Sequence, residues 1–280
     1  MNDEPRGHAA PARTAVASAI EMRNVAVAFT LPNGTTYQAV AATNLSVGLR
    51  EFVAVVGPTG CGKSTLLNVA AGLLAPSAGD ALILGAPLIG LNRAAGYLLQ
   101  QDALMPWKTA RDNVAIGLEV GGTPRSEALQ RADGWLKKVG LAAFADRYPH
   151  QLSGGQKKRV GLAQVLIRDP QILLMDEPFG PLDAQTRQIM GTLLLELWAA
   201  DRKAVLFITH DLEEAIALAD RVLIMSAGPE AGIIGDYRID LGRPRDASEI
   251  RLLPGFHALH KAIWTRLKDE VMRAYAGGGP

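Results

Sequence analysis

The chain has 280 residues, of which 48% are hydrophobic, and its 29 Lys and Arg against 28 Asp and Glu leave a net charge of +1. That length can bury a sizeable core, and a near-neutral charge argues against a general nucleic-acid binder, which carries a basic excess. A single cysteine excludes both an intrachain disulfide framework and a zinc site built from cysteines alone, and it fits a reducing compartment.

The N-terminal segment is rich in Ala, Pro and Arg and lacks the apolar core of a signal peptide. We predict a disordered lead-in over residues 1–20. No apolar run in the chain reaches the roughly 18 residues that a transmembrane helix needs, so we expect a partner to supply any membrane span. Residues 25–47 mix β-branched residues with a turn at Pro32-Asn33-Gly34, which predicts an antiparallel β hairpin or meander.

Short apolar runs alternate with helical patterns from residue 52 onwards, and this order predicts an α/β fold with a mainly parallel core sheet. The runs have the length of buried strands and lie at 52–56, 81–84, 97–99, 172–175 and 205–209. Apolar residues at helical spacing between the last two runs complete a right-handed strand–helix–strand unit. Further helical patterns cover 64–74, 127–139 and 156–167.

The region of about 103–168 has helical patterns and little strand signal, so we predict a helical subdomain inserted between strands of the sheet. The inserted subdomain would belong to one domain that spans 21–250. Residues 251–280 form a predicted C-terminal helical extension, because apolar residues recur there on one helical face. We expect that face to pack on its own domain. Its members are Phe256, Leu259, Ile263 and Leu267.

Residues 57–64 read Gly-Pro-Thr-Gly-Cys-Gly-Lys-Ser and match the phosphate-binding pattern G-x-x-x-x-G-K-[ST] between a predicted strand and a predicted helix. Glycines let the backbone turn its N–H groups toward phosphate, and the helix N-terminus adds its positive dipole end. Lys63 would reach the β- and γ-phosphates, and the Ser64 hydroxyl would bind Mg²⁺. Cys61 stands at a variable position of this pattern, and we expect it to act only as a small side chain that fills space. The predicted ATP-binding residues are Gly57, Pro58, Thr59, Gly60, Cys61, Gly62, Lys63, Ser64 and Thr65.

Asp176 and Glu177 follow the apolar run 172–175, where ligands of an open parallel sheet bind. Asp176 would contribute to the Mg²⁺ shell, and Glu177 is free to act as general base on an attacking water. The alternative is a solvated acidic pair that starts a turn before Pro178.

Residues 152–156 read Leu-Ser-Gly-Gly-Gln. Together with the two motifs above, this string resembles the ATP-binding subunit of ABC transporters, and the resemblance covers roughly 22–245. Its predicted ATP contacts are Ser153, Gly154, Gly155 and Gln156, at another helix N-terminus that exposes N–H groups to an anion. Ser153 could equally cap its own helix. The resemblance implies a head-to-tail dimer, with each ATP between the Lys63 loop of one copy and the Ser153 loop of the other.

Other positions carry over from the family one at a time. Gln100 resembles the glutamine that senses Mg²⁺ and faces the membrane partner, with Gln101 as a competing assignment. Asp183 resembles the acidic residue of the D-loop, although it could simply cap the next helix, and Pro181 stands where the family more often has a small residue.

His210 resembles the switch histidine that contacts the γ-phosphate. Asp211 and Glu214 after it form a predicted capping-box variant that starts the next helix and holds His210 at the edge of the sheet. Phe29 stands where the family stacks an aromatic ring on adenine, and Tyr37 is the alternative.

Several strings are similar to the nitrate, sulfonate and taurine importer branch of the family. They are MPWKTARDNV at 105–114, DEPFGPLDAQTR at 176–187, THDLEEAIALADRV at 209–222 and LGRPRD at 241–246. The chain ends soon after the last of these, which predicts that it lacks the extra β domain of sugar-importer ATPases. Departures from the usual pattern are Arg50 in place of a glycine, the pair Lys157-Lys158, and Gln164.

The branch implies hydrolysis of ATP coupled to import of a small oxyanion-bearing or heteroaromatic solute. The expected partners are a second copy of the chain, an integral membrane permease dimer and, indirectly, an extracytoplasmic solute-binding protein, with no nucleic acid. The expected location is peripheral, on the cytoplasmic face of the inner membrane. The alternatives are a soluble ABC ATPase that acts on nucleic acid or ribosomes, and the ATPase of an exporter.

Overall fold

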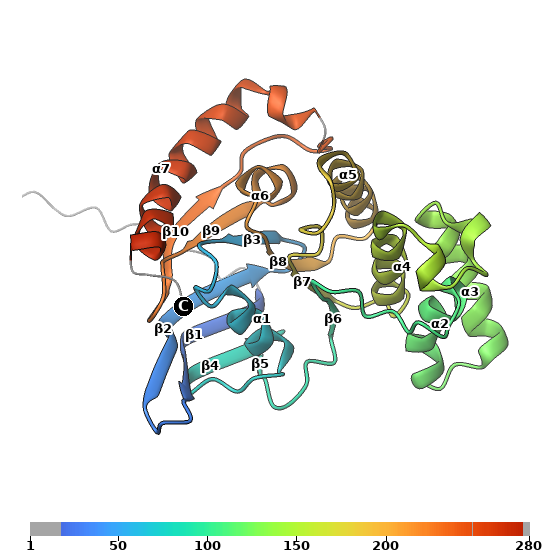
Figure 1. The fold of residues 1–280 in the computed structure, drawn as a ribbon, viewed down its shortest axis with the longest axis horizontal. Coiled ribbons are helices and arrows are strands. Elements are labelled where there is room, and N and C mark those ends of the chain that lie inside the picture. The colour runs from blue at the N-terminus through green and yellow to red at the C-terminus, as the bar shows by residue number, and fades with distance from the viewer. Residues whose placement is uncertain (1–17, 248, 277–280) are drawn as a thin grey trace, which may run out of the picture.

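The fold joins two β-sheets, a helical lobe and a long C-terminal helix, as the computed structural model shows (Figure 1). The structure describes residues 18–247 and 249–276. Most of the predicted disordered lead-in therefore lies outside the described residues. Its last three residues, 18–20, need a correction, since they begin strand β1 and pair with neighbouring strands.

The strands and helices follow one another in the α/β order that the sequence predicts. The strands are β1 (Ser18–Thr30), β2 (Thr36–Gly48), β3 (Phe52–Val56), β4 (Ala78–Ile83), β5 (Ala86–Pro87), β6 (Ala95–Leu98), β7 (Ile172–Asp176), β8 (Ala204–Ile208), β9 (Arg221–Met225) and β10 (Ile233–Arg238). The α-helices are α1 (Lys63–Ala71), α2 (Ala110–Val120), α3 (Arg125–Lys138), α4 (Gly154–Leu166), α5 (Ala184–Ala200), α6 (Leu212–Leu218) and α7 (Pro254–Ala276), and the 3₁₀ turns are η1 (Ala142–Phe144), η2 (Pro149–Gln151) and η3 (Ile250–Leu252).

The core sheet has six strands in the order β10-β9-β3-β8-β7-β6. All neighbours run parallel except β10, which is antiparallel to β9. The carboxyl ends of β3, β7 and β8 therefore meet at one edge, where Asp176 ends β7 and the phosphate loop and His210 follow β3 and β8. The predicted fold class, α/β with a mainly parallel core sheet, is confirmed.

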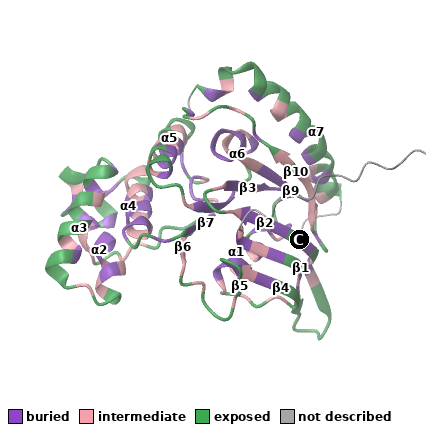
Figure 2. Ribbon diagram, turned by 180° about the vertical axis from the view of Figure 1, so that it is seen from behind, coloured by how far each residue is buried: buried purple, intermediate pink, exposed green. Residues whose placement is uncertain are grey.

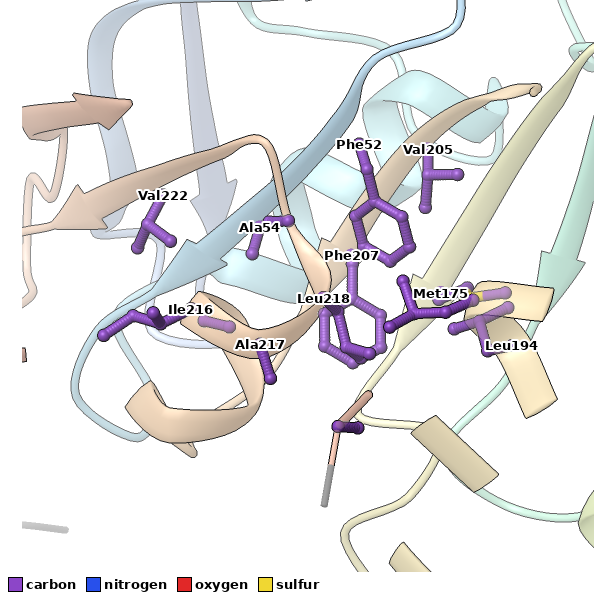
Figure 3. Close-up of a cluster of buried hydrophobic side chains, with 14 of the residues drawn as sticks. Phe52, Ala54, Met175, Leu194, Val205, Phe207, Ile216, Ala217, Leu218 and Val222 are labelled. Atoms are coloured by element: carbon purple, nitrogen blue, oxygen red, sulfur yellow. The ribbon is translucent and has the colours of Figure 1, made fainter. Parts of the chain in front are cut away.

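Alternation along the buried strands explains why they read as continuous apolar runs. In β3, Phe52, Ala54 and Val56 join the core on the side of α5, α6 and α7, whereas Val53 and Val55 face α1 and the second sheet. Helices or a sheet cover both faces, so neither can be polar. Figure 3 shows Phe52 and Phe207 close together in the first of these cores, and their ring centroids lie 5.8 Å apart.

The second sheet is antiparallel, with the strand order β2-β1-β4-β5. β1 and β2 form the predicted hairpin, in which Phe29 pairs with Tyr37 near the turn. The predicted strand at 81–84 belongs to this sheet and not to the core sheet, because β4 pairs antiparallel with β1. Between β2 and β3, Arg50 takes the left-handed φ of 60° at the position where the family has glycine.

The helical lobe contains α2, α3, α4, η1 and η2 and lies to one side of the core sheet, with its own buried cluster (Figures 1 and 2). These elements fall inside the range of 103–168 where we predicted helices. Strands β9 and β10 complete the other edge of the core sheet, and our reading of the sequence missed both.

Helix α7 runs along the β9–β10 side of the core (Figure 1). The predicted face is oriented inward, with Phe256, Ile263 and Leu267 buried and Leu259 half-buried. Among the described residues, no helix combines the length and the apolar character needed to cross a membrane.

Candidate functional site

The phosphate loop curls between β3 and α1 because three of its positions require glycine. Gly60 and Gly62 have φ angles of 78° and 95°, in the left-handed region that side chains disfavour. A Cβ on Gly57 would lie 2.8 Å from the carbonyl oxygen of Met225, which is closer than real contacts allow. Helix α1 begins at this loop with no side-chain cap and no acidic residue in its first turn, so its N-terminal N–H groups stay open to an anion.

Lys63 is buried in this loop, with 6% of its surface exposed. Its Nζ donates to the carbonyl oxygens of Gly57 at 2.9 Å and Pro58 at 2.8 Å. Within the described part of the chain it has no salt-bridge partner, so the ammonium is held by neutral groups alone. A buried cation of this kind is stabilised by an anion, and the loop therefore fits the phosphates of a nucleotide.

Cys61 and Thr59 occupy opposite environments in the same loop. Cys61 is 1% exposed and packs in the apolar cluster under the loop, and burial raises the pKa of its thiol. It can contribute only its backbone to a bound phosphate. Thr59, Gly60 and Ser64 are exposed at the surface where such a ligand would enter.

Two sequence motifs that lie far apart in the chain meet at Ser64 and Asp176. The Ser64 hydroxyl donates to Asp176 Oδ1 over 2.9 Å. Burial raises the pKa of the Asp176 carboxyl, and the nearby charge of Glu177 adds to this, while the Ser64 hydrogen bond and Lys63 oppose it. Mg²⁺ prefers hard oxygen ligands and usually takes one or two from protein carboxylates beside substrate phosphates. The hydroxyl and carboxylate here fit that donor set.

Glu177, His210 and Gln100 form a second group beside the first. Glu177 Oε2 lies 3.2 Å from Nδ1 of His210 and 3.4 Å from Nε2 of Gln100. These residues follow β7, β8 and β6, which are neighbours in the core sheet. Glu177 has a left-handed φ of 41°, a conformation that costs a non-glycine residue about 1 kcal/mol and that concentrates at functional sites.

The segment 209–214 holds His210 in place, but not through the capping box that we predicted. Asp211 does cap α6, since its Oδ1 accepts from the N–H groups of Glu213 at 2.9 Å and Glu214 at 3.1 Å. The Glu214 side chain does not return to Asp211 and accepts a hydrogen bond from the Thr209 hydroxyl. Burial raises the pKa of Glu214 to about 7, with the Thr209 hydrogen bond acting in the opposite direction. The second half of the predicted box is therefore wrong.

Ser153 caps its own helix, which was one of the two readings of the sequence. Its Oγ accepts from Gln156 N at 3.2 Å, and Gln156 Oε1 accepts from Ser153 N at 2.9 Å. Gly155 leaves no room for a side chain, because a Cβ would lie 2.7 Å from Thr186 Cγ2. Helix α4 belongs to the helical lobe, well away from α1 (Figure 1). Within one chain, the described hydrogen bonds do not join this loop to the phosphate loop.

Asp183 also caps its helix, since Oδ1 accepts from Thr186 N at 2.9 Å. Hydrogen bonding to the Thr186 side chain, and then to its backbone N–H, lowers the pKa of Asp183. Our sequence analysis missed the residue that holds the loop before it. Arg187 donates to the carbonyl oxygen of Leu182 at 3.1 Å and to Asp211 Oδ2 at 2.9 Å. It thereby ties the Asp183 loop to the segment that carries His210, through contacts that no local sequence pattern reveals.

The two candidates for stacking on adenine lie side by side on the hairpin of β1 and β2. Phe29 and Tyr37 are paired in register, and each is 39% exposed. Tyr37 and the phosphate loop share Gly228 as a neighbour, since a Cβ on Gly228 would lie 3.9 Å from Tyr37 Oη and 3.6 Å from the Gly60 carbonyl oxygen. Phe29 therefore stays a prediction, with Tyr37 as its alternative.

Two further buried polar residues escaped the sequence analysis. Lys158 is 4% exposed, and its Nζ donates to the Gln100 carbonyl oxygen at 2.6 Å and pairs with Asp102 at 3.0 Å. It links the Ser153 helix to the Gln100 segment. Asn113 is fully buried and binds the loop of Met105, which presents Trp107 with 72% of its surface exposed.

Comparison with known proteins gives a consistent picture. Residues 40–180 match the family described as ABC transporter. An uncharacterized ABC transporter ATP-binding protein of Methanocaldococcus jannaschii is 45% identical over 243 residues, which cover 86% of this chain and 89% of that protein. The taurine import ATP-binding protein TauB of Roseobacter denitrificans is 39% identical over 260 residues, which cover 90% of this chain and 96% of that protein.

Among solved structures, the fold is similar to a dimeric ATP-binding cassette in a post-hydrolysis state, bound to ADP and Pi. The TM-score is 0.70 at 30% sequence identity, and the match covers 80% of this chain and all of the other.

Proposed function

The chain belongs to the ABC transporter family as an ATP-binding, ATP-hydrolysing subunit, and from this we propose that it powers import of a small solute through a separate membrane permease. The observation that carries the proposal is the 2.9 Å hydrogen bond between Ser64 and Asp176, which joins the phosphate loop to the acidic strand end. It makes one site of the phosphate loop and the Asp176-Glu177 pair, which alone could be a solvated acidic turn.

In the proposed ATP complex, the phosphates lie over the open N-terminus of α1. Lys63 exchanges the carbonyl oxygens of Gly57 and Pro58 for the β- and γ-phosphate oxygens, so a buried ammonium gains an anionic partner. Either Phe29 or Tyr37 stacks on the adenine from the hairpin.

Ser64 and Asp176 would hold a Mg²⁺ ion, with Gln100 as the third proposed ligand. When bound, Mg²⁺ neutralises negative charge that the phosphates carry. The Asp176 carboxylate must be ionised to serve, and Lys63 nearby favours that form.

We propose that Glu177 accepts the proton of the water that attacks the γ-phosphorus. A bond forms between the water oxygen and the γ-phosphorus, while the bond from that phosphorus to the oxygen bridging to the β-phosphate breaks, which leaves ADP and inorganic phosphate. His210 lies 3.2 Å from Glu177 and would orient it and the γ-phosphate. Positioning and electrostatic stabilisation would supply most of the rate acceleration.

A second copy of the chain completes the site in this proposal. The Ser153–Gln156 loop lies in the helical lobe, apart from the phosphate loop of its own chain (Figure 1). A head-to-tail dimer would bring the loop of one copy onto the ATP of the other, together with Asp183. The dimeric cassette with ADP and Pi supports self-association in this family.

The permease would dock around the segment from Gln100 to Trp107, which connects β6 to the helical lobe. An indole that is 72% exposed on a loop anchored by buried Asn113 is a rigid aromatic contact, of the type that dominates protein interfaces. The names of the taurine-import relatives support import of a taurine-like, sulfonate-like or nitrate-like solute. Import implies an extracytoplasmic solute-binding protein and a position on the cytoplasmic face of the membrane.

Phosphate release from ATP and Mg²⁺ by the purified chain tests the proposed site. Lys63→Ala should lose nucleotide binding, measured with a fluorescent ATP analogue. Glu177→Gln should retain binding and lose about 10²- to 10⁴-fold in turnover, the usual contribution of a general base. Lys261→Ala, which removes an exposed lysine of α7, is the matched control. Normal turnover by Glu177→Gln would overturn the general-base assignment.

Import itself is tested in proteoliposomes with the permease and its binding protein. Transport of a sulfonate should require ATP inside and should stop with Glu177→Gln. Transport that continues without hydrolysis would contradict the proposed function.

A further inference from the structure

Helix α7 carries a buried carboxylate that the proposed chemistry does not use. Of the acidic residues that the structure describes, Glu270 is the most deeply buried, with 4% of its surface exposed. Its Oε2 accepts from the backbone N–H of Ala227 at 2.9 Å, and its Oε1 pairs with Arg273 at 2.7 Å. Arg273 is 70% exposed, so its ion pair is screened by solvent, and the Ala227 bond is the buried one.

Ala227 begins a loop that crosses from α7 to the hairpin of β1 and β2. Glu230 N donates to Gln38 O at 2.9 Å, and Ala41 N donates to Ala231 O at 2.9 Å. The 226–231 loop is therefore held at its far end by backbone bonds to β2. At its near end it is held by Glu270 and by two bonds between Ser226 and Gly232, from Ser226 N to Gly232 O at 2.9 Å and from Gly232 N to Ser226 Oγ at 3.1 Å.

The middle of this loop lies beside the phosphate loop. A Cβ placed on Gly228 would lie 3.6 Å from the Gly60 carbonyl oxygen, 3.7 Å from Cys61 Cα and 3.9 Å from Tyr37 Oη. Gly228 is therefore a neighbour of Gly60 and Cys61, and the 226–231 loop borders the peptide groups that would face phosphate. Gly57 meets the same segment at the end of β9, where the Met225 carbonyl oxygen leaves no space for a side chain.

We propose that Glu270 is a positioning residue for nucleotide binding, which rests on the proposed ATP site. By fixing Ala227, it holds the 226–231 loop against Gly60 and Cys61, and so keeps the phosphate loop in the shape that receives ATP. The C-terminal helix thereby contributes to nucleotide affinity without touching the nucleotide.

Because the contact between Glu270 and Ala227 lies on the phosphate-loop side of the site, its loss should change KM for ATP and not kcat. Glu270 acts on the loop after β3, whereas Glu177 and His210 follow β7 and β8, and hydrogen bonds of their own hold them. Loosening the 226–231 loop should therefore weaken ATP binding and leave the rate of the chemical step unchanged. A loss of general stability would not produce this separation between KM and kcat.

The experiment compares Glu270→Ala with Glu270→Gln in the full chain. Glu270→Ala should raise KM for ATP and Kd for a fluorescent ATP analogue about tenfold, since one buried charge-assisted hydrogen bond is lost, while kcat stays within about twofold. Glu270→Gln keeps an oxygen that can accept from Ala227 and should restore KM to within about threefold of wild type. Asp269→Ala, an exposed carboxylate on the same helix, is the matched control and should change neither constant.

An unchanged KM in Glu270→Ala, or a fall in kcat with KM unchanged, overturns the proposal. If Glu270→Ala does not fold, Glu270→Asp decides, because the shorter carboxylate keeps its charge but retracts from Ala227. It should raise KM about threefold, and an unchanged KM again overturns the proposal. Lys63→Ala distinguishes failure of the proposed function from failure of the role given to Glu270. If Lys63→Ala retains ATP binding, the proposed function fails. If Lys63→Ala loses ATP binding while Glu270→Ala matches wild type, only the role of Glu270 fails.

Discussion

Replacing Asn113 with alanine should loosen the loop that presents Trp107. The Asn113 Oδ1 accepts from Met105 N at 2.7 Å, and its Nδ2 donates to the carbonyl oxygens of Met105 at 3.1 Å, Lys108 at 3.0 Å and Thr109 at 3.0 Å. Two of these carbonyls keep a backbone donor, from Lys108 N and from Asn113 N. The Met105 N–H and the Lys108 carbonyl oxygen would lose the hydrogen bonds that Asn113 supplies. Each such group costs about 1–3 kcal/mol, so we expect about 3 kcal/mol of lost unfolding free energy.

Urea unfolding followed by circular dichroism measures this loss, and permease-stimulated hydrolysis measures its effect on docking. Trp107→Ala is the matched comparison, because it removes an exposed side chain and should cost less than about 0.5 kcal/mol. Both variants should lose permease stimulation, and both should keep the basal hydrolysis of the free chain. A destabilisation below about 1 kcal/mol in Asn113→Ala would refute the reasoning about this loop.

Three other predictions concern Glu214 of α6, Gly57 of the phosphate loop and Gly134 of α3. Glu214, bound to Thr209, has its pKa raised to about 7 in the folded state, so its stabilising contribution is full below about pH 4.5 and lost as pH rises through 7. Between about pH 4.5 and 7, wild type should lose about 3 kcal/mol of unfolding free energy relative to Glu214→Gln. If the unfolding free energies of the two proteins change in parallel with pH, this prediction is contradicted. Gly57→Ala should abolish ATP-analogue binding, because its Cβ would lie 2.8 Å from Met225 O; retained affinity would show that the loop adapts. Gly134→Ala, in open space within α3, should instead add about 1 kcal/mol of stability and leave ATP affinity unchanged, and a lower melting temperature would contradict this.

The fold was predictable where the burial of a strand or helix leaves a local pattern of apolar residues in the sequence. The apolar runs that became β3, β7 and β8 are buried on both faces, so their composition alone identifies them. Strand β9 has the same character and could have been found in the same way. Strand β10 lies at the sheet edge and is half-exposed, so it carries neither a continuous apolar run nor clean alternation.

The candidate site was predictable where spacing in the sequence matches spacing in the fold. The phosphate loop is one contiguous stretch, and Asp176 and His210 each follow a buried strand of the same sheet. The residues that escaped prediction bind partners distant in sequence. Lys158 holds the Gln100 segment and Glu270 holds Ala227, and nothing in their own neighbourhood of the chain indicates either contact. The capping box at Asp211 failed for a local reason, because the nearby Thr209 hydroxyl takes the Glu214 carboxylate.

We propose that two copies of the chain enclose ATP and that Glu177 then acts in its hydrolysis. The mass of the Glu177→Gln variant in solution with ATP and Mg²⁺ tests this proposal most directly. This variant should bind ATP between two copies and fail to release it by hydrolysis. Light scattering on the eluted protein should then give twice the monomer mass of 29.8 kDa with ATP, and the monomer mass without nucleotide. Serine-loop variants such as Ser153→Arg should bind ATP and stay monomeric. A Glu177→Gln protein that remains at 29.8 kDa with ATP bound would contradict the account.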